Sequence, residues 1–499
     1  MDTKEIANFI NESTTNFKKQ LKSKLNKEYL LQQVMLNKQT LITCLIIMFM
    51  LGIFLKFNFI SWLFGLIIVP IITKAIYNNK TLIFFQLIFS MTMLSGTLYL
   101  GMNGIFKLLP DIFAFIILIK LFVKLFKNEI KIKNIYIVTI FIIFLINIIS
   151  FMINRYSLLS FIAGLRNYYI FYISFLGYIY LDIKKYEIKQ IIKYIIIFAF
   201  IQVPLSIFQY FYYMNQDVVL FQDYVSGTFG ERLNGDLGFL IVIITALFIA
   251  ALIYGKLSIK KILLLGLFAI PIILGEIKIV LLALPIVITV IVLNKVSKNT
   301  IKILICSASV IGLIFAGLIL KFPEFRNMFD VKYIKYYAYD LGYGDYTLNR
   351  ISAPIYVNDT ILDTTPKKIF GIGVGNGTDN GSDIVNSDFY KENSMLGAQL
   401  FFSSLYLMEN GWLAMILFII MILSVLIKAI KIQKYSNNKD EKIFALAIKG
   451  IMVMIFISFI YSLSIFNLTM GYLIFFLLGV TIRISSDIPG GNYESKIST

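Results

Sequence analysis

The chain has 499 residues, a formal net charge of +18 and a hydrophobic content of 59%. Soluble domains usually contain about 45–50% apolar residues, and a water-soluble fold could not bury the excess. Apolar runs of about 18 or more residues recur along the chain, and each is long enough to cross a hydrocarbon core of roughly 30 Å. The composition therefore predicts an all-α polytopic membrane protein.

The positive charge indicates topology and argues against a nucleic-acid partner. The lysines lie in short segments between the apolar runs, where the positive-inside rule places them on the cytoplasmic side. Cys44 and Cys306 both fall within apolar runs, so the sequence suggests no disulfide, Cys-ligated zinc site or CxxC motif. The chain has no histidine, which excludes His general bases, Ser-His-Asp triads and His-ligated metals.

The apolar runs predict about fourteen spans with both termini cytoplasmic. In chain order they cover 41–56, 58–76, 81–102, 110–126, 135–153, 160–181, 191–213, 237–255, 261–275, 277–294, 301–320, 410–430, 443–463 and 466–484. With this threading the basic segments 124–133, 184–193, 256–261, 295–302 and 428–449 all lie inside.

This threading divides the chain into five regions. Residues 1–40 lack the apolar core of a signal peptide and form a cytoplasmic basic arm, either an amphipathic helix on the inner leaflet or a solvated segment. A transmembrane bundle of about eleven helices follows over 41–320. We expect 321–409 to be a large, partly helical extracytoplasmic loop, since it is too long for a mere connector. Residues 410–484 add about three helices, and 485–499 form a cytoplasmic tail.

Arg166 lies inside an apolar run. Arg166, in the stretch GLRNYYIFY, is placed a few residues below the outer surface. A charged side chain costs roughly 2.5–3.5 kcal/mol at the centre of a membrane helix on insertion scales, which makes Arg166 a candidate functional residue. The alternative is a structural pair with a carboxylate on another helix.

Three further cations are predicted on the outer side. Arg232 follows the turn GTFGER, Lys278 lies in the short connection GEIK, and Arg350 begins RISAPIYVNDTIL. Such a group suits a phosphate or pyrophosphate, because guanidinium binds these oxygens bidentately.

Local ion pairs are the alternatives for two of these cations. Lys278 has Glu276 as a neighbour, and Arg232 has Glu231 and Asp236.

The segment 321–409 also contains FGIGVGNGT (370–378) and many tyrosines. Its glycine spacing is similar to that of phosphate-binding loops, but no strand precedes it, so we predict a tight turn that docks the loop onto the bundle. The tyrosines offer flat faces for sugar rings; the alternative is an aromatic belt at the membrane surface.

Five short stretches, taken in order and spacing, resemble the bacterial O-antigen polymerase and O-antigen ligase superfamily. The closest likeness is to a Wzy-type capsule or exopolysaccharide polymerase. The stretches are GLRNYYIFY, SGTFGERLNGDLGFL, LGEIKIVLLAL, the segment from Arg350 to Asn376, and LFFSSLYLMENGWLAMILF.

The resemblance implies a glycosyltransferase without metal or cofactor, at the outer face of the bacterial cytoplasmic membrane. Its donor would be a growing glycan on undecaprenyl pyrophosphate, and its acceptor a hydroxyl of another lipid-linked oligosaccharide repeat unit. Arg166, Arg232, Lys278 and Arg350 would hold the pyrophosphate, where fixed cations stabilise developing charge. Whether a polysaccharide chain-length regulator is a further partner stays open.

The chain departs from the ligase branch at the end of the loop. Ligases usually carry a His-Asn pair there, whereas this chain has AQLFFSSLYLMENG. If a general base takes the acceptor proton, a carboxylate must serve. The candidate catalytic residues are Glu392, Glu409 and Glu231, each of which could equally be a structural hydrogen-bonding group.

Three alternatives belong to other classes or branches. A lipid-linked oligosaccharide flippase or transporter usually has short outer loops and a two-halved repeat, which this sequence does not show. A peptidoglycan-type polymerase of the shape and division family typically has fewer spans. An O-antigen ligase-like transferase would need a base other than histidine.

Overall fold

The computed structural model describes residues 38–130, 134–216, 220–255, 259–294 and 344–488, with residue 218 and isolated residues between 302 and 342. Regular structure in this part of the chain is entirely helical, which confirms the all-α part of the predicted fold class for these residues. Nearly all of the arm 1–40, most of the span 301–320, most of 321–343 and most of the tail 485–499 lie outside the described residues.

The long helices follow the apolar runs closely. They are Lys38–Phe54, α2 (Phe59–Tyr77), α3 (Asn79–Tyr99), α4 (Leu109–Phe126), α5 (Ile135–Asn154), α6 (Leu158–Tyr180), α7 (Lys185–Met214), α8 (Asn234–Tyr254), α11 (Lys278–Leu293), α17 (Phe402–Tyr435), α18 (Lys439–Tyr461) and α19 (Gly471–Ser486). The predicted run 261–275 is instead two short helices, α9 (Ile259–Leu267) and α10 (Ala269–Leu274).

Seven of the described helices are long and apolar enough to cross a membrane: α2, α3, α5, α7, α8, α17 and α18. The others are shorter or more polar, so the count of about fourteen spans remains a prediction. The predicted span at 410 begins earlier, at Phe402, but the helix backbone breaks at Gly411, where φ is 71° and ψ is 179°.

The exposed side of α17 shows why these helices need a lipid environment. Over residues 413–430 its exposed stripe repeats every three or four residues and is wholly apolar, while the opposite face is packed against the protein. The stripe consists of Leu413, Ile416, Ile420, Leu423, Ile427 and Ile430. A face of this kind indicates an integral membrane protein, because contiguous apolar surface is rarely left in water.

The chain forms two compact units, residues 1–82 with 101–103 and residues 83–100 with 104–499. In the first unit the helix Lys38–Phe54 pairs with α2. Gly52 leaves space for the Trp62 ring, since a Cβ there would lie 2.5 Å from it. The Trp62 ring also contacts Phe49 and Phe57 at centroid distances of 5.6 and 5.7 Å.

In the second unit, an aromatic cluster surrounds Phe466, in the connection between α18 and α19. Gly471 packs on Phe171, and Gly479 packs on Tyr178. These two contacts show that α6 and α19 run parallel there. The Phe466 ring contacts the rings of Tyr168, Phe171, Tyr172, Phe402, Tyr406, Phe418 and Phe475. Each such pair contributes roughly 0.5–1.5 kcal/mol beyond area burial, so this connection is firmly held.

Acidic and basic side chains meet at one end of the second unit. Lys124 pairs with Asp182 (2.7 Å), and Lys185 lies between Glu441 (2.9 Å) and Asp487 (3.3 Å). The predicted inner segments 184–193 and 428–449, and the described residues 124–130 of a third, therefore lie at the same end. The N-termini of α4, α8, α11 and α19 and the C-terminus of α18 lie at the opposite end, which carries the candidate site.

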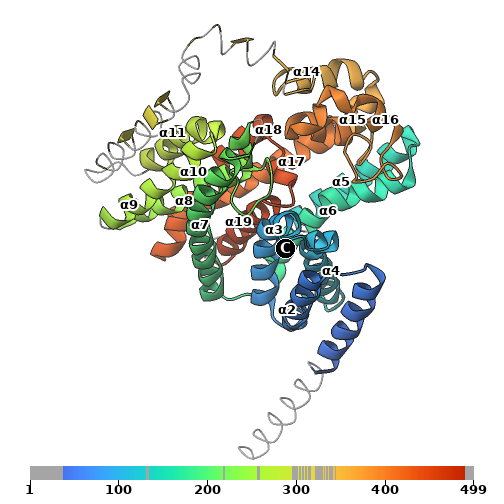
Figure 1. The fold of residues 1–499 in the computed structure, drawn as a ribbon, viewed down its shortest axis with the longest axis horizontal. Coiled ribbons are helices and arrows are strands. Elements are labelled where there is room, and N and C mark those ends of the chain that lie inside the picture. The colour runs from blue at the N-terminus through green and yellow to red at the C-terminus, as the bar shows by residue number, and fades with distance from the viewer. Residues whose placement is uncertain are drawn as a thin grey trace, which may run out of the picture. The chain divides into compact units, whose positions relative to one another are not determined.

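The described part of the predicted loop consists of short helices docked on the bundle. These are α14 (Ser352–Tyr356), the π-helical turn η5 (Val357–Ile361), α15 (Thr365–Phe370) and α16 (Asp388–Asn393). Figure 1 shows α15 and α16 beside α5, with α14 at the same side.

The glycine-rich turn 370–378 docks on the bundle through its backbone. Asn154 Nδ2 donates to the Gly371 carbonyl (3.1 Å), and the Tyr156 hydroxyl donates to the Val374 carbonyl (2.7 Å). On α6, Gly164 meets this turn so closely that a Cβ would lie 2.2 Å from the Gly375 nitrogen. The turn thus acts as the docking element that its sequence predicted.

Replacing Gly164 by alanine tests this docking. We expect Gly164→Ala to lower the free energy of unfolding by roughly 1–3 kcal/mol, since backbone atoms cannot yield to the methyl group. The matched control is Gly235→Ala in α8, where a Cβ meets nothing within 4 Å and alanine favours the helix. Thermal unfolding of the detergent-purified proteins measures the difference; equal midpoints would contradict the close packing.

Candidate functional site

The connection between α18 and α19 links the regions that carry the candidate cations. Just before it, the Tyr461 carbonyl accepts a hydrogen bond from Arg350 Nε (3.3 Å). Just after it, the Tyr472 hydroxyl donates to Asp111 Oδ1 (2.9 Å), and Asp111 also pairs with Arg166. One short segment, fixed by Phe466, therefore determines where Arg350 and Arg166 lie.

Within the connection, polar side chains bind a buried carboxylate. Asp236, in the first turn of α8, is 3% exposed and accepts hydrogen bonds from Ser464 (2.6 Å), Asn467 (2.9 Å) and Thr469. All three donors are neutral. The predicted local pairing of Arg232 with Asp236 is not among these contacts, because the Asp236 side chain points inward and is buried between helices.

Arg166 forms an ion pair with a carboxylate on another helix, which was the structural alternative. Its Nε and Nη2 both donate to Asp111 Oδ2, at 2.8 and 2.5 Å. The Arg166 side chain remains 41% exposed while Asp111 is 13% exposed. The pairing does not exhaust the guanidinium, which has five N–H donors.

The positive charges of Arg232 and Lys278 both influence the pKa of Asp223, which lies in the 3₁₀ turn Phe221–Tyr224 before α8. Burial raises the pKa of Asp223, while the hydrogen bond from Asn234 and the charges of Lys278 and Arg232 oppose that shift. The Asn234 side chain also donates to the Gly275 carbonyl (2.9 Å), which ties this turn to the connection before α11. The charges of these two predicted cations thus both favour the ionised form of one carboxylate.

Of the local ion pairs predicted as alternatives for these two cations, the contact of Lys278 with Glu276 is present. Lys278 Nζ lies 4.0 Å from Glu276 Oε2, at the outer limit of an ion pair. The Arg232 guanidinium lies over the Tyr224 ring, 5.6 Å from its centroid, and Arg232 has a φ of 57°. A non-glycine residue with positive φ is uncommon. This backbone conformation in the turn before α8 sets the direction of the exposed Arg232 side chain.

Arg350 packs against aromatic rings. Its guanidinium lies 4.2 Å from the Tyr461 ring centroid and 5.8 Å from that of Phe401. Together with the hydrogen bond to the Tyr461 carbonyl, these contacts anchor the start of α14 to the end of α18. Arg350 therefore has a structural role, and cation–π contacts of this kind contribute about 0.5–2 kcal/mol.

Glu409 is the most enclosed of the three candidate bases. It is 0% exposed; its Oε1 accepts from the Gly377 N–H (2.9 Å) and the Thr378 hydroxyl (2.7 Å), and its Oε2 from the Tyr168 hydroxyl (2.7 Å). These neutral donors come from the docked turn and from α6. Glu409 therefore joins the turn, α6 and α17, which is the structural alternative predicted for it.

The other two candidate bases are exposed and separate from Glu409. Glu392 lies in α16, and Glu231 lies in the turn before α8. No hydrogen bond among the described residues joins either of them to Glu409.

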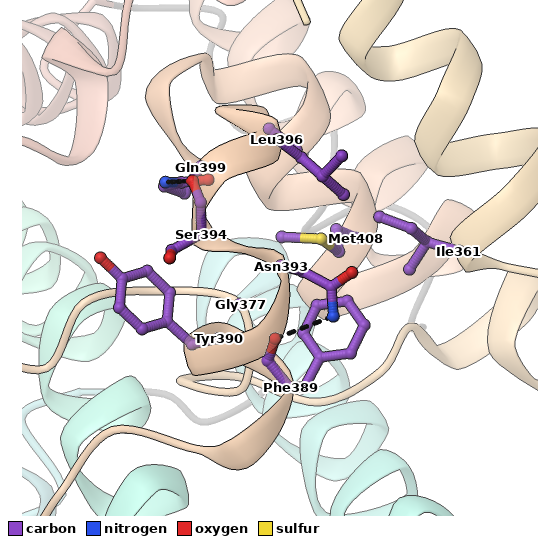
Figure 2. Close-up of a pocket in the computed structure, with 10 residues that line it drawn as sticks. Ile361, Gly377, Phe389, Tyr390, Asn393, Ser394, Leu396, Gln399 and Met408 are labelled. Carbon is purple, nitrogen blue, oxygen red and sulfur yellow. Dashed lines mark hydrogen bonds between the residues drawn. The ribbon is translucent and has the colours of Figure 1, made fainter. Parts of the chain in front are cut away.

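A small hollow lies beside the Glu409 turn, and its lining includes Tyr390, Asn393 and Met408. Figure 2 shows Tyr390 at one edge and Ile361 at the other, with Met408 and Asn393 between them. Its side-chain amides already bind backbone, because Asn393 Nδ2 donates to the Phe389 carbonyl (2.9 Å) and Gln399 likewise to Ser394. The hollow is a packing feature of the loop.

Sequence reasoning missed Asp111 and the structural use of Asp236. Each is a lone acid at the start of an apolar helix, in LPDIF and NGDLGF. That position is a usable signal, because unpaired carboxylates within membrane segments are costly and mark partners or sites. Their partners, however, lie far along the chain.

Comparison of the sequence with protein-family models and with curated proteins gives no match.

Substitutions of Glu409 separate its structural role from a catalytic one. We expect Glu409→Ala to lower the free energy of unfolding by roughly 2–4 kcal/mol, since it leaves buried donors without an acceptor. Glu409→Gln should cost much less, because the amide oxygen can still accept from Gly377 and Thr378 while the Tyr168 hydroxyl turns to accept from the amide N–H. The control is the exposed Glu392→Ala, expected within about 0.5 kcal/mol of the wild type. A Glu409→Ala protein as stable as Glu392→Ala would rule out the structural role.

Proposed function

We propose that the chain is a membrane polysaccharide polymerase. It transfers a growing glycan from undecaprenyl pyrophosphate to a lipid-linked oligosaccharide repeat unit at the outer face of the cytoplasmic membrane. The observation that carries this proposal is the half-exposed guanidinium of Arg166, held by Asp111 at the end of the bundle where Arg232, Lys278 and Arg350 also lie. Fixed cations at the ends of apolar helices suit a substrate with an anionic head group and a lipid tail.

The chemistry follows from the leaving group. The acceptor hydroxyl oxygen attacks the anomeric carbon, the bond from that carbon to the pyrophosphate oxygen breaks, and the hydroxyl proton passes to a base. Arginine forks bind the departing pyrophosphate bidentately and stabilise its charge. Glu392 and Glu231 are exposed and can accept a proton from a bound substrate, whereas Glu409 is committed to its hydrogen bonds.

The membrane orientation is part of the proposal. Three lysine-rich segments share one end of the second unit, and the positive-inside rule assigns such an end to the cytoplasm. The end with Arg166 then faces outward. This orientation is the one needed for a reaction on lipid-linked glycans outside the cell.

Two other functions use the same head-group chemistry. A lipid-linked oligosaccharide flippase needs a route for the head group through the bundle, whereas rings packed around Phe466 fill the space between α6, α17 and α19. An O-antigen ligase-like transferase differs only in its acceptor. The polymerase is the better supported of the three.

Loss of the Arg166 guanidinium should abolish polymerisation. We expect Arg166→Ala to reduce glycan laddering by on the order of 10²-fold or more, in line with the loss of one donor to a developing anion. The assay uses purified protein and a lipid-linked repeat unit, with accumulation of single repeats as the second readout. The matched control, Arg155→Ala, removes an exposed arginine next to α6 and should keep the ladder. Normal polymer length in Arg166→Ala would refute the pyrophosphate assignment.

Thiol labelling on intact cells tests the orientation. In a background without Cys44 and Cys306, Ser382→Cys places a thiol in the exposed turn near Asp379. It should react with a membrane-impermeant reagent, because the loop is predicted outside. Asn437→Cys, in the exposed turn between α17 and α18, should react only after permeabilisation. The reverse pattern would overturn the orientation.

A further inference from the structure

Arg166 binds Asp111 through Nε and Nη2, which leaves the other N–H groups of its guanidinium for an anion. We infer that Asp111, held by Tyr472, is a positioning residue that orients the Arg166 guanidinium toward the pyrophosphate of a lipid-linked substrate. This inference rests on the proposed function, which supplies the pyrophosphate.

Asp111 uses only one edge of the guanidinium. The Nε–H and one Nη2–H point to Asp111 Oδ2, at 2.8 and 2.5 Å. Of the five N–H donors, both on Nη1 and the second on Nη2 remain. The edge between Nη1 and Nη2 presents two parallel N–H groups, which is the arrangement that binds phosphate bidentately.

Asp111 is itself fixed from the other side. The hydroxyl of Tyr472, a residue buried at the start of α19, donates to Asp111 Oδ1 at 2.9 Å. The start of α19 cannot shift freely, because a Cβ on Gly471 would lie 2.5 Å from the Phe171 ring. Asp111 therefore accepts hydrogen bonds from both Tyr472 and Arg166. Through these bonds the rigid aromatic packing fixes the position of an exposed cation.

Positioning and simple charge predict opposite effects of removing Asp111. Deleting a carboxylate beside Arg166 makes the site more positive, so electrostatics alone would tighten the binding of a pyrophosphate. Deleting the group that holds the guanidinium lets a side chain with much rotamer freedom move, which weakens bidentate binding. The sign of the change therefore identifies the role.

The test measures the dissociation constant of the full-length purified protein for undecaprenyl pyrophosphate, with undecaprenol as the uncharged reference. We expect Asp111→Ala to weaken binding of the pyrophosphate lipid roughly 10-fold, as for a lost hydrogen bond to a charged group. Tyr472→Phe should weaken it by about 3-fold, because Tyr472 acts on Arg166 only through Asp111. Undecaprenol binding should not change.

Asp111→Asn is the conservative variant, and its difference from Asp111→Ala identifies positioning, because both variants lose the same negative charge. Its amide oxygen can still accept from Arg166 and its amide group can face Tyr472, so the orientation is kept while the negative charge is lost. We expect it to bind the pyrophosphate lipid at least as tightly as the wild type. Asp383→Ala, which removes an exposed carboxylate in the loop, controls for net charge and should bind as the wild type.

The outcomes separate this inference from the proposed function. Unchanged or tighter binding in Asp111→Ala, with weak binding in Arg166→Ala, overturns the positioning role and leaves the pyrophosphate site standing. Wild-type binding in Arg166→Ala overturns both. Thermal unfolding checks that each variant is folded. If Asp111→Ala does not fold, Asp111→Ser and Tyr472→Phe replace it, and unchanged binding in both also overturns the inference.

Discussion

The structure depends on the placement of one connection, residues 462–470 between α18 and α19. Its Phe466 ring is packed among rings from α6, α17 and α19, and its polar side chains bind the buried carboxylate of Asp236. A buried carboxylate without partners is costly, so the hydrogen bonds and the ring packing require each other. Because Tyr461 and Tyr472 flank this connection, Arg350 and Arg166 take their positions from it.

In a bilayer, close packing and hydrogen bonds between helices contribute a larger share of the stability than they do in water. Lipid tails are as apolar as leucine, so helices associate through close packing and hydrogen bonds. The glycines at contacts fit this requirement, since Gly164 admits a backbone turn and Gly471 admits an aromatic ring. The hydrogen bonds to Glu409 work in the same way, because they join α6, α17 and the docked turn without any charged partner.

The helices could be predicted from the sequence because hydropathy is a local property. Helix α5 was expected over 135–153 and is observed over Ile135–Asn154, and the start predicted at 410 adjoins the break at Gly411. The candidate site was predictable only in part. Arg166 is conspicuous within an apolar run, but its partner Asp111 lies 55 positions away. Such partnerships arise from packing between helices, which no local pattern encodes.

The close contact between Gly371 and Gly411 has a mechanical consequence. A Cβ on Gly411 would lie 2.4 Å from the Ile369 carbonyl oxygen, and one on Gly371 would lie 2.4 Å from that of Glu409. The two backbones therefore touch directly, and the docked turn cannot be displaced without carrying residues 402–410 with it. The break at Gly411 lets residues 402–410 stay with the docked turn while the rest of α17 keeps its own helical path.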